Sequence, residues 1–292
     1  MDMRISAECV MCILNVRAGE ILNSCLDANA KLEAIRELTK YIAEVAKPGT
    51  LTTTLASLGF RKVKTLTGNE DPYLQLKIEA DRAAEKAVKL LINRLVGLSD
   101  EDRFRLAAIS SINANLIDPG IAGYDFSLDE LREVIFNDEL AIDDLHEIYR
   151  KVNTAKIVVY LLDNAGEAVF DKVLMTEIKR KGAKVYAVVK GRAYQNDVSV
   201  KDAERIGLGT VVDAILSTEN DFSSLVPGTY SRKIDEITSK ADLVIAKGMA
   251  HYETLSEIDI GRPVAFLLKA KCGPVAASLN VRPGSNVALL QS

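Results

Sequence analysis

Residues 157–167, IVVYLLDNAGE, decide the fold class of this chain. Their first six positions form an unbroken apolar run, which is typical of a strand buried on both faces of a parallel sheet. The polar residues Asp163 and Asn164 come next, followed by Gly166 and Glu167, where we expect a helix to begin. A buried strand that runs directly into a helix is the repeating unit of three-layer α/β domains.

The same alternation continues from residue 153 to residue 292. Strand-like runs lie at 157–162, 184–190, 211–216, 242–247 and 264–269, a final run at 287–290 is expected at a sheet edge, and helix-like segments lie at 167–181, 200–206 and 230–240. We therefore predict a Rossmann-like three-layer α/β/α domain with a mostly parallel sheet over residues 153–292.

Residues 1–152 differ, because their apolar positions recur every three or four residues, which predicts a helical domain. Helices are expected at about 6–24, 29–46, 51–66, 71–96, 99–116 and 127–137. Three starts carry capping signals: Asp71 followed by proline, Ser99 followed by acidic residues, and Ser127 with a glutamate three positions later. The sequence thus predicts two domains, 1–152 and 153–292.

The composition of the chain argues against several classes of function and of metal site. The chain has 292 residues, with 37 Lys and Arg against 41 Asp and Glu, a net charge of −4 and 48% hydrophobic residues. This acidic balance argues against nucleic acid as the main partner. Without an apolar run of about 20 residues or a secretory signal, we expect no membrane span and a cytoplasmic location. Only two histidines are present, which excludes a His-rich zinc site and favours oxygen ligands, or cysteine, for any metal.

Polar clusters follow three of the predicted strands, and the carboxyl ends of parallel strands meet at one edge of a sheet. Asp163 and Asn164 follow the first strand, and Asp197 lies in the cluster at 190–197 after the second. Mg²⁺ prefers a coordination shell with a small number of protein oxygens, which water and phosphate oxygens complete. Each cluster alone is also explained as a helix cap or a polar loop, but their coincidence at one edge predicts a metal site.

A lysine marks the third cluster, at residues 246–253. Lys247, next to Gly248 after the fourth strand, is placed to reach a phosphate as a point charge, although a solvent-exposed lysine is the usual alternative. The first strand is followed by neither a glycine-rich dinucleotide loop nor a P-loop motif. Dinucleotide oxidoreductases and P-loop NTPases therefore lose their best sequence support.

The cysteines form a weaker signal. Cys9 and Cys12 share one face of the first predicted helix, Cys25 lies farther on, and Cys272 lies near the end of the chain. A single C-x-x-C favours two alternatives equally. Cys9, Cys12 and Cys272 act as structural thiols or metal ligands that join the two halves, or they are small apolar residues in a reducing compartment.

Taken in order, these motifs resemble those of the DUF89 family, the ARMT1-like metal-dependent damage-control phosphatases. The resemblance rests on DNAGE at 163–167, Asn196-Asp197, Lys247-Gly248, Tyr252-Glu253, Cys9-x-x-Cys12, Asp71-Pro72-Tyr73 and Asn115-x-x-Asp118. The helical half is similar to the branch with an N-terminal C-x-x-C that is common in archaea. Ala114 replaces the family's usual glycine and His251 replaces its asparagine, whereas the matching metal ligands are intact.

The resemblance implies a site between the two halves, with a divalent metal (Mg, Mn, Co or Ni) held by Asp163, Asn164 and Asp197. It implies catalytic roles for Asp163 and Lys247, the latter in contact with phosphate. The residues expected on the substrate side are Asn115, Asp118, Glu167, Lys190, Lys247, His251 and Glu253. Substrates in the family are small phosphorylated metabolites, including sugar phosphates and phosphopantetheine derivatives.

We therefore predict a metal-dependent phosphomonoesterase that acts on small phosphate esters, with no nucleic-acid or membrane partner. Asp163 attacks phosphorus itself, or it holds a metal that activates water, and the sequence leaves both roles open. A carboxyl methyltransferase that uses S-adenosylmethionine is one alternative, although no Gly-rich loop follows the first strand. A non-catalytic protein that binds a metal or a metabolite is another. The sequence sets no oligomeric state.

Overall fold

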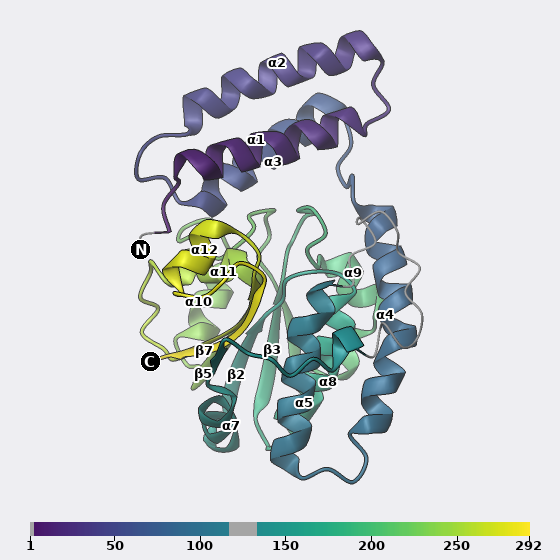
Figure 1. Ribbon diagram of the computed structural model, residues 1–292, viewed down its shortest axis with the longest axis vertical. Coiled ribbons are helices and arrows are strands. Elements are labelled where there is room, and N and C mark those ends of the chain that lie inside the picture. Colours follow the sequence, from purple (N-terminus) through teal and green to yellow (C-terminus); the bar gives the residue numbers. More distant parts are fainter. Residues whose placement is uncertain (1–2, 117–132) are drawn as a thin grey trace.

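A mostly parallel sheet of seven strands lies at the centre of the computed structural model, which describes residues 3–116 and 133–292 (Figure 1). Its order is β1-β7-β6-β5-β2-β3-β4, and among the neighbouring pairs only β6 and β7 run antiparallel. The strands are β1 Ile142–Asp143, β2 Ile157–Leu161, β3 Lys184–Val189, β4 Ala214–Ser217, β5 Leu243–Lys247, β6 Val264–Ala270 and β7 Ser285–Gln291. The predicted α/β class with a mostly parallel sheet is confirmed.

One strand was placed wrongly. The run at 287–290 was expected at an edge, but β7 pairs with β6 on one side and with β1 on the other. The true edge strand on that side, β1, is only two residues long. Two residues are too few to produce an alternating or continuous apolar pattern, so no local pattern indicates this strand.

Helices cover both faces of the sheet (Figure 1). On one face lie α4 Leu74–Arg94, α5 Asp100–Asn113, α7 Leu145–Thr154, α8 Glu167–Arg180 and α9 Val200–Arg205, and on the other α10 Arg232–Thr238, α11 Gly248–Leu255 and α12 Gly273–Ser278. Strand β2 serves both layers, because Val158 and Tyr160 pack into one core and Val159 and Leu161 into the other. A strand buried on both faces explains its unbroken apolar run.

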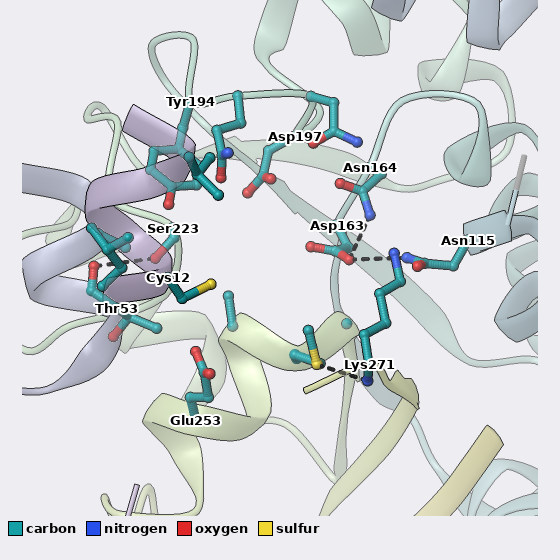
Figure 2. A pocket seen from close by; sticks show the side chains of 18 of the residues that line it. Cys12, Thr53, Asn115, Asp163, Asn164, Tyr194, Asp197, Ser223, Glu253 and Lys271 are labelled. Carbon is teal, nitrogen blue, oxygen red and sulfur yellow. Dashed lines mark hydrogen bonds between the residues drawn. The ribbon is translucent and has the colours of Figure 1, made fainter. Parts of the chain in front are cut away.

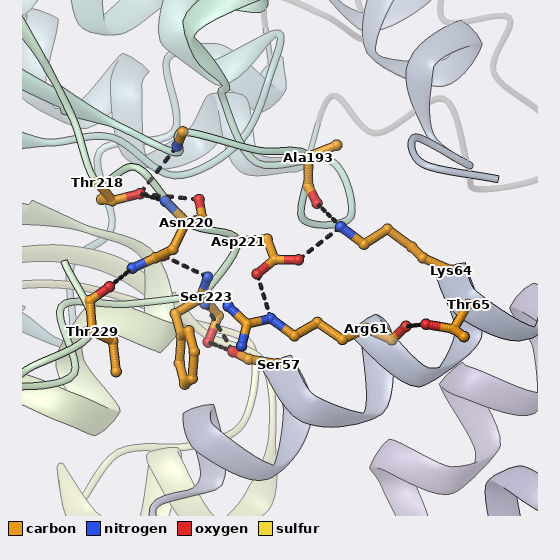
Figure 3. Close-up of polar contacts among 12 residues, drawn as sticks. Ser57, Arg61, Lys64, Thr65, Ala193, Thr218, Asn220, Asp221, Ser223 and Thr229 are labelled. Carbon is orange, nitrogen blue, oxygen red and sulfur yellow. Dashed lines mark hydrogen bonds and ion pairs between the residues drawn. The ribbon is translucent and has the colours of Figure 1, made fainter. Parts of the chain in front are cut away.

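Three further helices, α1 Ala7–Leu22, α2 Ala28–Val45 and α3 Thr52–Thr67, lie across one end of the sheet and have a core of their own (Figure 1). Helix α3 is fastened to the loop after β4. Asp221 in that loop pairs with Arg61 at 2.5 Å and with Lys64 at 2.7 Å, and Lys64 also donates to the carbonyl of Ala193 at 3.2 Å (Figure 3). The α1–α3 layer is therefore held in a fixed position over the sheet.

The start of α4 differs from its prediction. Asp71 was expected to cap the helix with proline at its first position, but α4 begins at Leu74 and its N-cap is Tyr73. The carboxylate of Asp71 instead accepts a hydrogen bond from Lys77 Nζ at 2.8 Å. The predicted cap at Ser99 is confirmed, since its side chain accepts from the amide of Asp102 at 3.2 Å.

The chain before residue 153 takes part in the sandwich itself, since α4 and α5 share a core with the sheet and β1 joins the sheet. The division near residue 152 stays a prediction. The expected capping box at Ser127 and the position of Asp118 lie outside the described residues. None of the described helices is long and apolar enough to cross a membrane.

A buried ionic network ties α4 to two turns at the sheet edge. Asp81 accepts from the amide of Gly166 at 2.8 Å and from Arg205 at 2.6 and 2.9 Å. Arg205 also pairs with Asp202 at 2.7 Å, and Asp202 pairs with Lys77 at 2.8 Å. The network joins the turn after β2 to helix α9, which follows the loop after β3.

Removing the Asp81 side chain should disrupt this ionic network. In Asp81→Ala, the Gly166 amide loses its acceptor and Arg205 loses one of its two carboxylates, so we expect the free energy of unfolding to fall by about 3 kcal/mol. Denaturant unfolding followed by circular dichroism measures this loss. The control is Glu33→Ala, which breaks an exposed pair with Arg36 and should cost less than about 1 kcal/mol. Equal losses in the two variants would contradict a structural role for Asp81.

Candidate active site

A cavity of about 320 Å³ lies where the carboxyl ends of the strands meet the α1–α3 layer (Figure 2). Its lining includes Asp163, Asn164 and Asp197 from the turns after β2 and β3, and Gly248, the first residue of α11, directly after β5. Helices α1 and α3 contribute the opposite part of the wall, including Thr53. The polar clusters that the sequence placed at three strand ends therefore do meet, and they meet at one cavity.

Asp163 lies at the floor of this cavity and is 8% exposed. Its Oδ2 accepts from the side-chain amides of Asn164 at 2.8 Å and Asn115 at 3.4 Å. Gly248 packs directly on this carboxylate: its φ is +76°, and a Cβ there would lie 2.0 Å from Asp163 Oδ2. Only glycine fits, because a side chain would be strained at that φ and would displace the carboxylate.

The loop that carries Asp197 runs alongside the turn that carries Asp163. Val198 donates its amide to the carbonyl of Asp163, and Ala165 donates to the carbonyl of Asn196, both at 2.8 Å. Asp197 is 5% exposed, and its Oδ2 lies 3.3 Å from the ammonium of Lys190. These backbone bonds fix Asp197 beside Asp163, as the sequence analysis expected of two strand ends.

The charges around Asp163 favour a cation. Burial raises the pKa of Asp163 well above its usual value, and the neighbouring carboxylates of Glu167 and Asp197 raise it further. Burial likewise raises the pKa of Asp197 to about 6, although Lys190 lies 3.3 Å away and opposes the shift. Clustered buried carboxylates with raised pKa values are stabilised when a cation binds among them.

The donor set fits a hard divalent metal with an incomplete protein shell. No three His, Cys, Asp or Glu side chains within 3–116 and 133–292 gather into a metal site. A metal at Asp163 and Asp197 would therefore also need the amide oxygen of Asn164, together with water or phosphate. The amide nitrogen of Asn164 already donates to Asp163 and Glu167, which leaves its oxygen as the acceptor side.

Lys247, predicted to contact phosphate, lies beneath the cavity and does not line it. Its side chain is fully buried, and its ammonium contacts Glu167 and lies 2.9 Å from Asp171 and 3.3 Å from the carbonyl of Ser111. Burial alone would lower the pKa of Lys247, but Asp171 and Glu167 hold it above its usual value. Lys247 is thus a permanently charged partner of two buried carboxylates.

A lysine that the sequence analysis missed, Lys271, lines the cavity instead. It is exposed, it follows β6 directly, and its side chain extends toward Asp163 and Asn115 (Figure 2). Its positive charge lowers the pKa of Asp163, against the larger effect of burial. The strand-end rule that selected Lys247, the last residue of β5, also applies to the end of β6, so a signal for Lys271 was present.

The remaining predicted residues divide between the cavity and the layer behind it. Asn115 and Glu253 line the cavity, whereas Glu167 lies behind it and accepts from Asn115 at 2.6 Å. His251 is buried between the hydroxyl of Ser224 at 3.0 Å and the carbonyl of Leu162 at 3.2 Å, and burial keeps its pKa well below the usual value. Lys190 is buried as well and donates to the carbonyl of Ser223 at 2.6 Å.

All four cysteines are free thiols. Cys9 lies on α1 and its sulfur accepts from the hydroxyl of Ser6 at 3.3 Å, and Cys272 is the N-cap of α12. Cys12, also on α1, lines the cavity on the side of Glu253 (Figure 2). A structural role for Cys9, Cys12 and Cys272 stays a prediction.

Comparison with known proteins points to one family. Residues 5–287 match the family described as the damage-control phosphatase ARMT1-like domain. A damage-control phosphatase of Archaeoglobus fulgidus is 34% identical over 98% of this chain and 99% of its own length, and one of Pyrococcus horikoshii is 31% identical over 98% of each. The crystal structure of a DUF89 family protein from P. horikoshii superposes with a TM-score of 0.90 at 32% identity, covering 99% of this chain and 100% of that one.

Glu253 gives the cavity a measurable pH dependence. Burial raises its pKa to about 7, so the folded protein holds this proton more tightly than the unfolded chain does. The contribution of protonated Glu253 to the free energy of unfolding is complete below about pH 4.5 and is lost as the pH rises through 7. Between pH 5 and 8 the free energy of unfolding of wild type should therefore fall by about 2 kcal/mol relative to that of Glu253→Gln. Denaturant unfolding across that range measures it, with the exposed Glu33→Gln as control. If the free energies of unfolding of wild type and Glu253→Gln changed in parallel with pH, the raised pKa of Glu253 would be wrong.

Proposed function

The chain belongs to the damage-control phosphatase ARMT1-like family and is a phosphatase, and we propose that Asp163, Asn164 and Asp197 hold its divalent metal. The observation that supports this most is the pairing of the two turns after β2 and β3, which puts two buried carboxylates side by side. Mg²⁺, Mn²⁺, Co²⁺ and Ni²⁺ all suit a shell of carboxylate, amide and water oxygens.

When bound, such a metal polarises the phosphoryl oxygens and offsets the charge that develops in the transition state. The chain's own residues would orient the ester around it. Lys271 would neutralise a phosphoryl oxygen, and Asn115 would orient the carboxylate of Asp163 through its side-chain amide. Glu167 would hold Asn115 and Asn164 in place through one oxygen, and Lys247 would pair with its other oxygen, which makes Lys247 a positioning residue in this proposal.

The substrate class follows from the size of the cavity. A volume of about 320 Å³ is at the small end of ligand pockets and suits a sugar phosphate or a similar ester.

The methyltransferase alternative gains no support here, since the turn after β2 presents the Asp163 carboxylate where such enzymes need a loop for the cofactor. Four free thiols fit a reducing compartment, so we place the reaction in the cytoplasm.

We further propose that Cys9 and Cys12 mark the branch of the family with an N-terminal C-x-x-C. Cys272 comes from the far end of the chain, yet it lies near enough to Cys9 and Cys12 for these thiols to add to the effect of burial in raising its pKa. The three residues therefore lie near one another, between α1 and the start of α12. This proximity supports a structural role for the thiols.

The metal proposal predicts two losses of activity. Release of phosphate from a panel of sugar phosphates should fall at least about 100-fold with EDTA and recover when one of the four metals is restored. Asp163→Asn removes a carboxylate but keeps the shape of the side chain, and it should lower kcat by a similar factor even at saturating metal. The matched control is Asp143→Asn, outside the cavity, which should retain full activity. Equal turnover by wild type and Asp163→Asn would overturn the assignment.

The two lysines should separate cleanly. Lys271→Met removes an exposed charge, so we expect KM for phosphate esters to rise about 10-fold while stability changes by less than about 0.5 kcal/mol. Lys247→Met strands the buried carboxylates of Glu167 and Asp171 and should cost about 3–5 kcal/mol of stability. Steady-state kinetics and denaturant unfolding distinguish them. An unchanged KM in Lys271→Met would remove Lys271 from the site.

A further inference from the structure

Arg17 is a buried cation that the phosphatase mechanism does not use. It lies on α1, the helix that also brings Cys12 to the cavity, and it lines the cavity although only 2% of its surface is exposed. The other lysines and arginines of the lining are Lys269 and Lys271, which belong to β6 and the residues just after it. In Figure 2, Cys12 and Lys271 lie on different sides of the cavity, so positive charge is supplied from two separate walls.

The hydrogen bonds of Arg17 are incomplete. A guanidinium has five N–H donors. Within the described chain, Nη2 pairs with Glu20 at 3.1 Å, Nη1 makes one long contact with the carbonyl of Ala56 at 3.5 Å, and Nε has no partner. Buried polar groups are almost always hydrogen-bonded, so a buried arginine with an unused donor beside a cavity is incomplete as a purely structural residue.

The guanidinium is nevertheless held firmly in place. Its carbon lies 5.0 Å from the ring centre of Phe60 and 6.0 Å from that of Tyr194, and its aliphatic stem packs against Gly59, where a Cβ would come within 3.3 Å of it. The α3 side of this wall is fixed by the ion pairs of Asp221 (Figure 3). A charged group fixed before the ligand arrives binds an anion with little further loss of entropy.

The carboxylate that balances Arg17 is a weak counter-ion. Glu20 is also buried, its Oε1 is shared with the hydroxyl of Tyr73 at 2.8 Å, and its Oε2 has no partner among the described residues. Burial raises the pKa of Glu20 against the opposing effect of Arg17. The local environment therefore disfavours the charged form of Glu20, the side chain that pairs with Arg17 within the described residues.

We propose that the cavity takes phosphate esters that carry a second anionic group, and that Arg17 binds this group while the metal and Lys271 take the reacting phosphate. The proposal rests on the proposed phosphatase function and makes Arg17 a specificity residue. A planar fork of N–H donors suits a carboxylate or a second phosphate, and not a neutral hydroxyl. The volume of about 320 Å³ limits the substrate to a small doubly anionic ester.

The test uses phosphate monoesters of straight-chain alcohols with two to six carbons, ending in a hydroxyl, a carboxylate or a second phosphate. Wild type should prefer one of the anionic series at its best chain length. Arg17→Gln should lower kcat/KM for that series about 10- to 100-fold and leave the hydroxyl series within about twofold. The preferred series identifies the second group as a carboxylate or a phosphate.

Two variants guard against a folding artefact. Arg17→Gln combined with Glu20→Gln removes the buried pair without stranding Glu20, and it should show the same selective loss. Glu20→Gln alone should keep the anionic preference, as should Arg36→Gln on the exposed face of α2. A thermal melt of each variant verifies folding.

The outcomes divide cleanly. An equal loss on all three series would mean that Arg17 serves the reacting phosphate or the fold, and the proposal would be wrong. An unchanged preference would also overturn it. If wild type hydrolyses no ester with any of the four metals, the phosphatase proposal fails by itself. The Arg17 proposal is then decided by calorimetric Kd values for the same esters, in which the same selective loss is required.

Discussion

The ammonium of Lys247, buried between Glu167 and Asp171, is the interaction on which the site depends. A lone charge in this position would be unstable, so the three groups must stay together once the sheet and α8 have formed. The consequences reach the cavity because the second oxygen of Glu167 accepts from Asn115 and Asn164. The core thus sets the orientation of two amides that face the cavity.

The cavity is built from segments that are held by different means. The turns after β2 and β3 are joined by backbone hydrogen bonds and by the ionic network of Asp81, so the predicted metal ligands lie on a rigid frame. The wall opposite is formed by α1 and α3, which have their own core and meet the sheet through polar contacts such as Asp221 with Lys64. The candidate metal ligands therefore lie on the frame of the sheet, and Arg17 lies on the wall opposite.

Much of the candidate site could be predicted from where polar residues lie relative to the apolar strands. Asp163, Asn164 and Asp197 were found because they follow apolar strands, and the structure brings them to one cavity. The same rule indicates Lys247, the last residue of β5, and equally Lys271, directly after β6, yet of these two only Lys271 lines the cavity. A shift of one or two positions along the chain at a strand end decides where a lysine points, either into the buried cluster below the sheet edge or out into the cavity. The period of apolar residues does not locate a strand end that accurately.

The sequence by itself determined the layered fold, because an apolar run buried on both faces or an apolar stripe on a helix is a local property of the chain. It also determined that Asp163, Asn164 and Asp197 would gather at one sheet edge, since parallel strands point the same way. Only the tertiary structure decided which face of α1 meets that edge and therefore that Arg17 reaches the cavity. That choice depends on how α1, α2 and α3 pack on one another and on the sheet, which no local pattern encodes.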